Sequence, residues 1–162
     1  MRIIITGSPG TGKTAVAKLL GKKLKCAVIN EHDFCMRKGI GKFEGSELIV
    51  PLGKLRKAFN TELKRRKSII VEGHLLCEIK LGADAAILLR LHPELLEARL
   101  EKRGYNAEKI QDNVFCEGID YCKKHLYRNY GKKKIIEVSA HETAKETANI
   151  ILNKLKEKID IG

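Results

Sequence analysis

The eight residues from Gly7 to Thr14, with the sequence GSPGTGKT, constrain this chain more than any other stretch. They fit, without a mismatch, the phosphate-binding pattern of a glycine, four residues of any kind and Gly-Lys-Ser/Thr. Glycines let the backbone curl so that successive N–H groups point inward, and a following helix adds its positive N-terminal end. The apolar run Ile3–Ile5 precedes the motif, and Val16 and Leu20 follow it at helical spacing. This context disfavours a chance glycine-rich turn, so the stretch predicts a site for a polyphosphate.

The motif also predicts a role for each of its members. Backbone amides of the loop would surround the phosphates, while Lys13 would reach the β- and γ-phosphates as a point charge. The Thr14 hydroxyl would hold a Mg²⁺ ion that bridges the same oxygens. We therefore expect ATP with Mg²⁺ as the ligand, held by Gly10, Thr11, Gly12, Lys13, Thr14 and the backbone of Ala15.

Length and composition favour one folded domain over residues 1–162. The 162 residues suffice for a single well-packed core and are too few for two comfortable ones. No apolar segment approaches the roughly 20 residues of a membrane span, and Met1-Arg2 leaves no room for a signal peptide before the first strand. The five cysteines form no Cys-x-x-Cys pair, so they predict reduced thiols rather than a disulfide framework or a zinc site. A cytoplasmic location, without a membrane partner, is expected.

The charge favours polyanionic partners. The net charge is +12 and the pI is near 9.6. Two basic runs, at residues 54–67 and 123–134, carry much of this excess. In the first run Leu55, Phe59 and Leu63 recur at helical spacing, which is typical of an amphipathic helix with a solvated basic face. A surface that contacts RNA is the alternative for both runs.

Strand and helix patterns alternate along the chain, which predicts a three-layer α/β fold: a parallel sheet of about five strands with helices on both faces. Between Phe34 and Gly53 the pattern breaks down among several glycines, so we expect a loop-rich, mobile insertion there. The strands are predicted at residues 3–5, 27–29, 69–72, 85–91 and 135–138, and the helices at 11–25, 54–66, 94–103, 107–130 and 145–159.

The tripeptide Glu72-Gly73-His74 ends one of these apolar strands. Ligands of open parallel sheets bind just outside the carboxyl ends of the strands, so Glu72 would face the phosphate loop. There it would help to hold Mg²⁺ through water, and His74 would orient the attacking group. In the purely structural alternative Glu72 caps the strand and His74 satisfies a local carbonyl.

Arg99 and Arg103 lie four residues apart, on one face of a predicted helix that ends at Gly104. A fork-shaped cation on a closing lid stabilises the charge that develops during phosphoryl transfer, and Arg103 is the candidate for this role. Ion pairing with Glu101 or Asp112 is the alternative to phosphate binding. For Arg99 the two interpretations are equally favoured.

The run RGYNAEKIQDNVFCE, from Arg103 to Glu117, resembles the lid of the adenylate kinase 6 family, also called CINAP. That lid typically contains RGYN, then DN and CE, and the phosphate loop of this chain is similar to the family's loop. The resemblance covers most of the chain up to about Glu117. It departs where the family has Asp-x-His, because this chain has Glu72-Gly73-His74, and the family's arginine in the monophosphate region has only the displaced Arg37 as a counterpart.

The resemblance implies a P-loop nucleoside monophosphate kinase with a mobile monophosphate-binding region at residues 30–53 and a lid at 102–112. Its implied reaction converts ATP and AMP to two ADP, with accompanying ATPase activity. Asp33 and Arg37 would then bind the monophosphate, and the loop 139–142 would line the adenine pocket. The implied biological role is small ribosomal subunit maturation, with a ribosomal protein of the uS11 type and rRNA as partners.

Two further hypotheses stay open at this stage. The basic excess also suits an RNA- or ribosome-bound ATPase switch in which kinase turnover is incidental. A third possibility is another small-molecule kinase on the same scaffold, with an acceptor such as shikimate or CMP.

Overall fold

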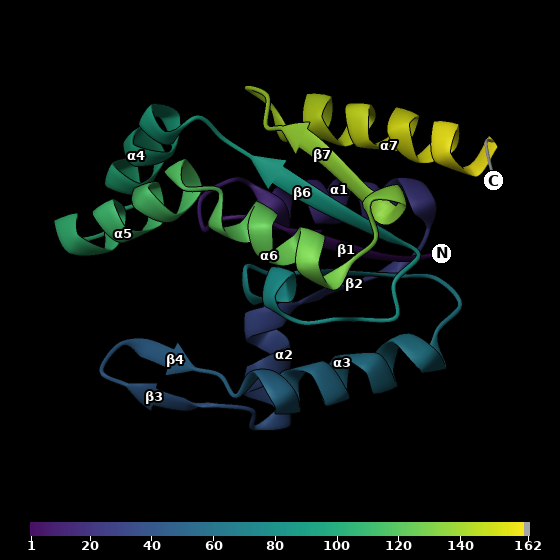
Figure 1. Cartoon of the computed structure of the whole chain (residues 1–162), viewed down its shortest axis with the longest axis horizontal. Helices are drawn as coiled ribbons and strands as arrows, with labels where there is room; N and C mark the ends of the chain where they lie inside the picture. Colours follow the sequence, from purple (N-terminus) through teal and green to yellow (C-terminus); the bar gives the residue numbers. More distant parts are fainter. Residues whose placement is uncertain (161–162) are drawn as a thin grey trace.

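A computed structural model describes the backbone of residues 1–160 and the side chains through Lys158. Its centre is a five-stranded parallel sheet with the strand order β2-β5-β1-β6-β7 (Figure 1). β1 lies in the middle, so the phosphate loop that follows it leaves the sheet between two neighbours. The predicted parallel sheet is therefore confirmed, with strands β1 (Arg2–Thr6), β2 (Ala27–Asn30), β5 (Ile69–Glu72), β6 (Ala85–Arg90) and β7 (Ile135–Ser139).

Helices cover both faces of the sheet because its strands carry apolar residues on both sides. In β1, Ile3 and Ile5 pack toward one face and Ile4 toward the other, as the two-residue period of a strand requires. Helices α1 (Lys13–Leu24) and α7 (Ala144–Asp160) cover the first face. The second face is covered by α3 (Leu52–Arg65), α6 (Tyr121–Asn129) and the short 3₁₀ turn η1 (Leu75–Glu78).

A separate helical pair extends beyond the carboxyl ends of β6 and β7 (Figure 1). Helices α4 (Pro93–Lys102) and α5 (Ala107–Gly118) pack through Leu96, Leu100 and Ile110. The expected start of α4 is confirmed, since Pro93 occupies its first turn, where the missing N–H costs nothing. The residues expected to form the lid, 102–112, comprise the last residue of α4, the link between the two helices and the first half of α5.

The prediction of a loop-rich segment over residues 34–53 was wrong. Helix α2 (Glu31–Lys38) and a hairpin of β3 (Lys42–Glu44) and β4 (Glu47–Ile49) occupy most of it. The Asn30 side chain caps α2 by accepting the Asp33 N–H at 3.0 Å. Gly39, with φ of 62°, ends the helix, and Gly45, with φ of 61°, lies in the hairpin turn. Gly39 and Gly45, two of the glycines that suggested a loop, are therefore a helix cap and a turn residue.

The single helix expected over residues 107–130 was also wrong, because it is two helices. α5 ends at Gly118 and α6 begins at Tyr121, with Asp120 between them in the left-handed region at φ of 58°. The Asp120 carboxylate forms an ion pair with Arg90 at the end of β6, which favours this break over a continuous helix.

Cys35, Cys77 and Cys122 are buried free thiols, and Cys26 and Cys116 are partly exposed ones. Within residues 1–160 no helix is both long and apolar enough to cross a bilayer.

Candidate active site

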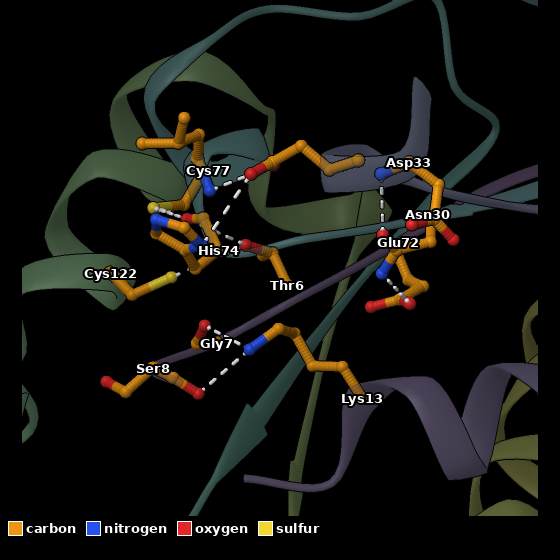
Figure 2. A network of polar contacts seen from close by, with 12 residues as sticks. Thr6, Gly7, Ser8, Lys13, Asn30, Asp33, Glu72, His74, Cys77 and Cys122 are labelled. Atoms are coloured by element: carbon orange, nitrogen blue, oxygen red, sulfur yellow. Dashed lines mark hydrogen bonds and ion pairs between the residues drawn. The ribbon is translucent and has the colours of Figure 1, made fainter. Parts of the chain in front are cut away.

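The phosphate loop follows β1 and curls at Gly10 and Gly12, whose φ angles of 89° and 94° lie in the left-handed region. Lys13 folds back over this curl: its Nζ donates to the carbonyl oxygens of Gly7 and Ser8, each at 2.9 Å (Figure 2). Burial lowers the pKa of Lys13 below its usual value. The Lys13 ammonium therefore lies against the backbone of the phosphate loop, as the motif predicts.

Four residues from distant parts of the chain support the loop through polar contacts and packing. Ser8 donates its hydroxyl to Glu117 Oε2 at 2.6 Å, and Arg90 Nε donates to Glu117 Oε1 at 2.7 Å. A Cβ at Gly10 would lie 2.9 Å from side-chain atoms of Leu96 and Leu100, so α4 packs directly on the loop. Sequence reasoning included Glu117 only as a letter of the lid motif, because nothing in the sequence places it beside Ser8.

The pair predicted to hold a metal comes together. Thr14 Oγ1 donates to Glu72 Oε1 at 2.9 Å. Asn30 Nδ2 donates to the same oxygen at 2.6 Å, a contact that Figure 2 shows. Hydroxyl and carboxylate oxygens are the ligands that Mg²⁺ prefers, so these two residues fit the ion. Among the described residues no group of three or more His, Cys, Asp or Glu side chains forms a metal cage. Water and nucleotide phosphates would therefore supply the remaining ligands, as is common for Mg²⁺.

His74 faces the same cleft from the loop after β5, and Glu31, at the start of α2, lies behind it. His74 Nδ1 is 3.6 Å from Glu31 Oε1, and 54% of the His74 side chain is exposed, whereas Glu31 is buried. Burial raises the pKa of Glu31 to about 8. Partial desolvation, and then the positive charge of Lys13, lower the pKa of His74 to about 4. The sequence did not point to Glu31. Its neighbours in the sequence are polar, so it resembled a surface residue.

The predicted nucleotide-binding residues line two adjoining cavities. One, of about 450 Å³, contains Gly10, Lys13 and Thr14 together with the ends of β2 and β5. The other, of about 380 Å³, contains Thr11, Arg99 and the loop 140–142. Gly12, Ala15 and Arg103 line both cavities. A nucleotide that spans them would place its phosphates in the first cavity and its base in the second.

Arg99 lies closer to the loop than the sequence indicated. Its Nη1 donates to the Gly10 carbonyl at 3.4 Å, so its position on the loop side of α4 is set by a backbone contact. Arg103, one turn later, lies at the end of α4 where the two cavities meet. Both arginines therefore face the candidate site.

Asp33 and Arg37 are not in this cleft. They line a third cavity, of about 930 Å³, beside the edge strand β2 and the end of α3. The Arg37 guanidinium lies 5.9 Å from the centre of the Phe34 ring. Their predicted contact with a monophosphate stays a prediction, and it requires the 30–53 region to move relative to the cleft.

A parallel sheet whose central strand leads into a phosphate loop and a covering helix is the fold of P-loop kinases. A shikimate kinase from Aquifex aeolicus shares this fold, with a TM-score of 0.66 and 15% sequence identity over 100% of both chains. At this identity the likeness concerns the fold alone.

Closer relatives define the family. A family model described as an AAA domain matches residues 3–120. A protein from Thermococcus kodakarensis named "Putative adenylate kinase" is 36% identical, with 99% of this chain and 91% of the relative covered. A protein of the same name from Pyrococcus furiosus is 39% identical, with 98% and 86% covered. The chain belongs to this AAA domain family of P-loop proteins, together with these archaeal relatives.

Proposed function

We propose that the protein is a nucleotide kinase of the adenylate kinase type, which converts ATP and AMP to two ADP and also hydrolyses ATP slowly. The observation that carries the proposal is the convergence of Lys13, Thr14, Glu72 and Arg103 on two adjoining cavities at the carboxyl end of the sheet. The names of the archaeal relatives support adenylate chemistry, and the resemblance of residues 103–117 to the adenylate kinase 6 lid supports the same substrate pair.

The mechanism uses position and charge rather than a covalent intermediate. Amides of residues 10–15 and the Lys13 ammonium hold the phosphates of ATP. Thr14 and, through water, Glu72 would hold Mg²⁺, which would offset negative charge on the phosphates of ATP. Arg103 stabilises the charge on the transferred group, and its position at the end of α4 lets the 102–112 segment carry it inward. The base lies against the loop 140–142.

The acceptor side of the cleft is formed by Asn30, His32 and His74. His74 orients the acceptor or, in hydrolysis, the attacking water. Closure of the 30–53 region would bring Asp33 and Arg37 toward a bound monophosphate and exclude water from the reacting phosphates.

An acceptor screen tests this proposal. ADP formation from Mg-ATP is measured without an acceptor and with AMP, CMP or shikimate, while calorimetry measures Mg-ATP binding. AMP is expected to increase ADP formation more than the other acceptors do. A protein that binds no Mg-ATP, or one that AMP does not stimulate, would overturn the proposal.

A second candidate is an ATPase that acts while bound to RNA or to the small ribosomal subunit, with a uS11-type ribosomal protein as partner. The net charge of +12 favours it. So does α3, which buries Leu55, Phe59 and Leu63 and leaves its basic side chains at the surface. Slow reaction with AMP, together with hydrolysis that changes when RNA or the ribosomal protein is added, would favour this candidate over the kinase.

A further inference from the structure

Glu31 is a buried carboxylate to which the mechanism above gives no role. Only 4% of the residue is exposed, although it lies at the first position of α2, beside the cleft. Burial of a carboxyl group costs free energy unless specific contacts offset it. Its contacts therefore indicate why the chain keeps a glutamate there.

Those contacts cross from the start of α2 to the loop after β5. Glu31 Oε2 accepts the Leu75 N–H at 3.0 Å, and Glu31 Oε1 lies 3.6 Å from His74 Nδ1. One carboxylate thus touches both His74 and the residue that follows it. Because Nδ1 faces Glu31, the opposite edge of the ring, which carries Nε2, is left toward the cleft that His74 lines.

The space for this carboxylate exists because residue 73 is a glycine. A Cβ at Gly73 would lie 2.2 Å from Glu31 Oε2 and 2.4 Å from Glu31 Cβ. The Gly73 N–H donates to the Ile5 carbonyl at 3.1 Å, which fixes the backbone at this point. Any side chain at position 73 would therefore displace Glu31, so the two residues form one unit with His74.

We propose that Glu31 is a positioning residue for His74: it keeps Nδ1 of the imidazole inward, so that Nε2 is presented as a hydrogen-bond partner to a hydroxyl nucleophile, namely the water used in ATP hydrolysis. This inference rests on the proposed function and adds a residue to it. The ring of His74 is half exposed, and among the described side chains its polar contact is the one with Glu31, at 3.6 Å. Without Glu31 it would be free to rotate.

The two reactions of the site depend on this ring to different extents. Water is a small nucleophile that must be oriented as it attacks, so a hydrogen bond with the imidazole assists it. The phosphate of AMP has a second pKa of about 6 and attacks largely as the deprotonated oxyanion. Loss of the Glu31 contact should therefore slow hydrolysis more than transfer to AMP.

Steady-state kinetics on the full chain test this difference. Glu31→Ala should lower kcat for hydrolysis about tenfold or more, with a smaller loss in the rate of transfer to AMP and a change of less than about twofold in KM for ATP. Glu31→Gln, which keeps the shape and the acceptor for Leu75, should recover much of the loss. Glu137→Gln, on β7 and outside the cleft, is the matched control and should behave like the wild type.

A double-mutant cycle separates positioning through His74 from other roles. The variant Glu31→Ala/His74→Ala should hydrolyse ATP no more slowly than His74→Ala alone, because Glu31 acts only through that ring. Additive losses would overturn the inference. So would a raised KM or Kd for ATP without a change in kcat, since that would make Glu31 a counter-ion of Lys13.

A readout without turnover keeps this inference distinct from the proposed function. Long-range ¹H–¹⁵N spectra report the tautomer of His74, whose signals are assigned with His74→Ala. Glu31→Ala should shift the His74 ring nitrogens and leave those of the other four histidines unchanged. Unchanged His74 signals would overturn the inference even in an active kinase, whereas a wild type that AMP does not stimulate would overturn the proposed function alone.

Discussion

The two sides of the cleft are built in different ways. The phosphate loop, Gly7–Thr14, makes its internal polar contacts between residues that lie three to six positions apart, such as Lys13 with Gly7 and Thr11 with Ser8. The strand-end group, defined as Asn30, Glu31, Glu72 and His74, is joined by contacts between residues 42 and 43 positions apart, Asn30 with Glu72 and Glu31 with His74. Binding of phosphate is thus encoded locally, whereas the acceptor side depends on the register of β2 against β5.

Lys13→Ala tests the local side and should have the largest effect. Removal of the ammonium takes away the positive charge that contacts the transferred phosphoryl group, so we expect ADP formation to fall by about 10³-fold or more. Coupled assays of ADP formation measure this. Lys22→Ala, which removes an exposed lysine from the same helix, is the control and should retain activity. Equal activities of the two variants would remove the phosphate loop from the mechanism.

Glu117→Ala tests whether the loop depends on distant residues as well. The change leaves the Ser8 hydroxyl and the Arg90 guanidinium without their shared partner. We expect a loss of about 3 kcal/mol in the free energy of unfolding, measured with denaturant. The control is Glu62→Ala, which removes an ion pair with Arg66 at 2.8 Å, one helical turn away, and should cost less than about 1 kcal/mol. Similar losses of stability in both variants would mean that Glu117 does not stabilise the phosphate loop.

Arg103→Ala and Arg99→Ala sharpen the comparison at the point where the two cavities meet. Arg103 lines both cavities, so its loss should lower kcat for transfer about 100-fold with a small change in KM for ATP. Arg99 is held by the Gly10 carbonyl, and its loss should chiefly raise KM for ATP. Full kinetics with ATP and AMP varied separately distinguish the two. The reverse assignment of kcat and KM effects would exchange the roles of these arginines.

The smallest expected effect is the pH dependence of stability, which tests the strand-end group. The pKa of Glu31 rises from 4.5 to about 8 on folding, so the folded chain binds more protons there and stability falls as pH rises through that range. The pKa of His74 falls from 6.5 to about 4, which gives the opposite trend below about pH 6.5. Above about pH 6.5, only the titration of Glu31, and not that of His74, makes stability depend on pH.

Between about pH 6.5 and 8, the free energy of unfolding should therefore decrease with pH by at most about 1.4 kcal/mol per unit on account of Glu31. Glu31→Gln should flatten this slope, while Glu137→Gln should keep it. Denaturant titrations at a series of pH values measure the slopes. An identical slope in wild type and Glu31→Gln would show that the carboxyl group titrates normally in the folded protein.

The sequence predicted most of the sheet and one side of the site. Apolar runs such as Ile69–Val71 gave the strands, because strands buried on both faces are continuously apolar. The pairing of Thr14 with Glu72 was also expected, since both lie at the carboxyl end of the sheet. The prediction for residues 34–53 failed because, in the sequence, a glycine that ends a helix or lies in a hairpin turn looks the same as a glycine in a loop. The single helix predicted over residues 107–130 failed because the chain turns at Asp120, which has a positive φ and pairs with Arg90, 30 positions away.

By itself, the sequence determined the phosphate loop, the order of strands and helices along the chain, and the chemistry that a lysine and a hydroxyl can offer to a triphosphate. These features depend on neighbouring residues and on local backbone geometry. Only the tertiary structure decided that Glu31 lies behind His74, that Glu117 supports Ser8, and that Asp33 and Arg37 lie outside the cleft. The physical reason is that burial and pairing of polar groups are set by strand register and helix packing, which bring together residues that are distant in the sequence.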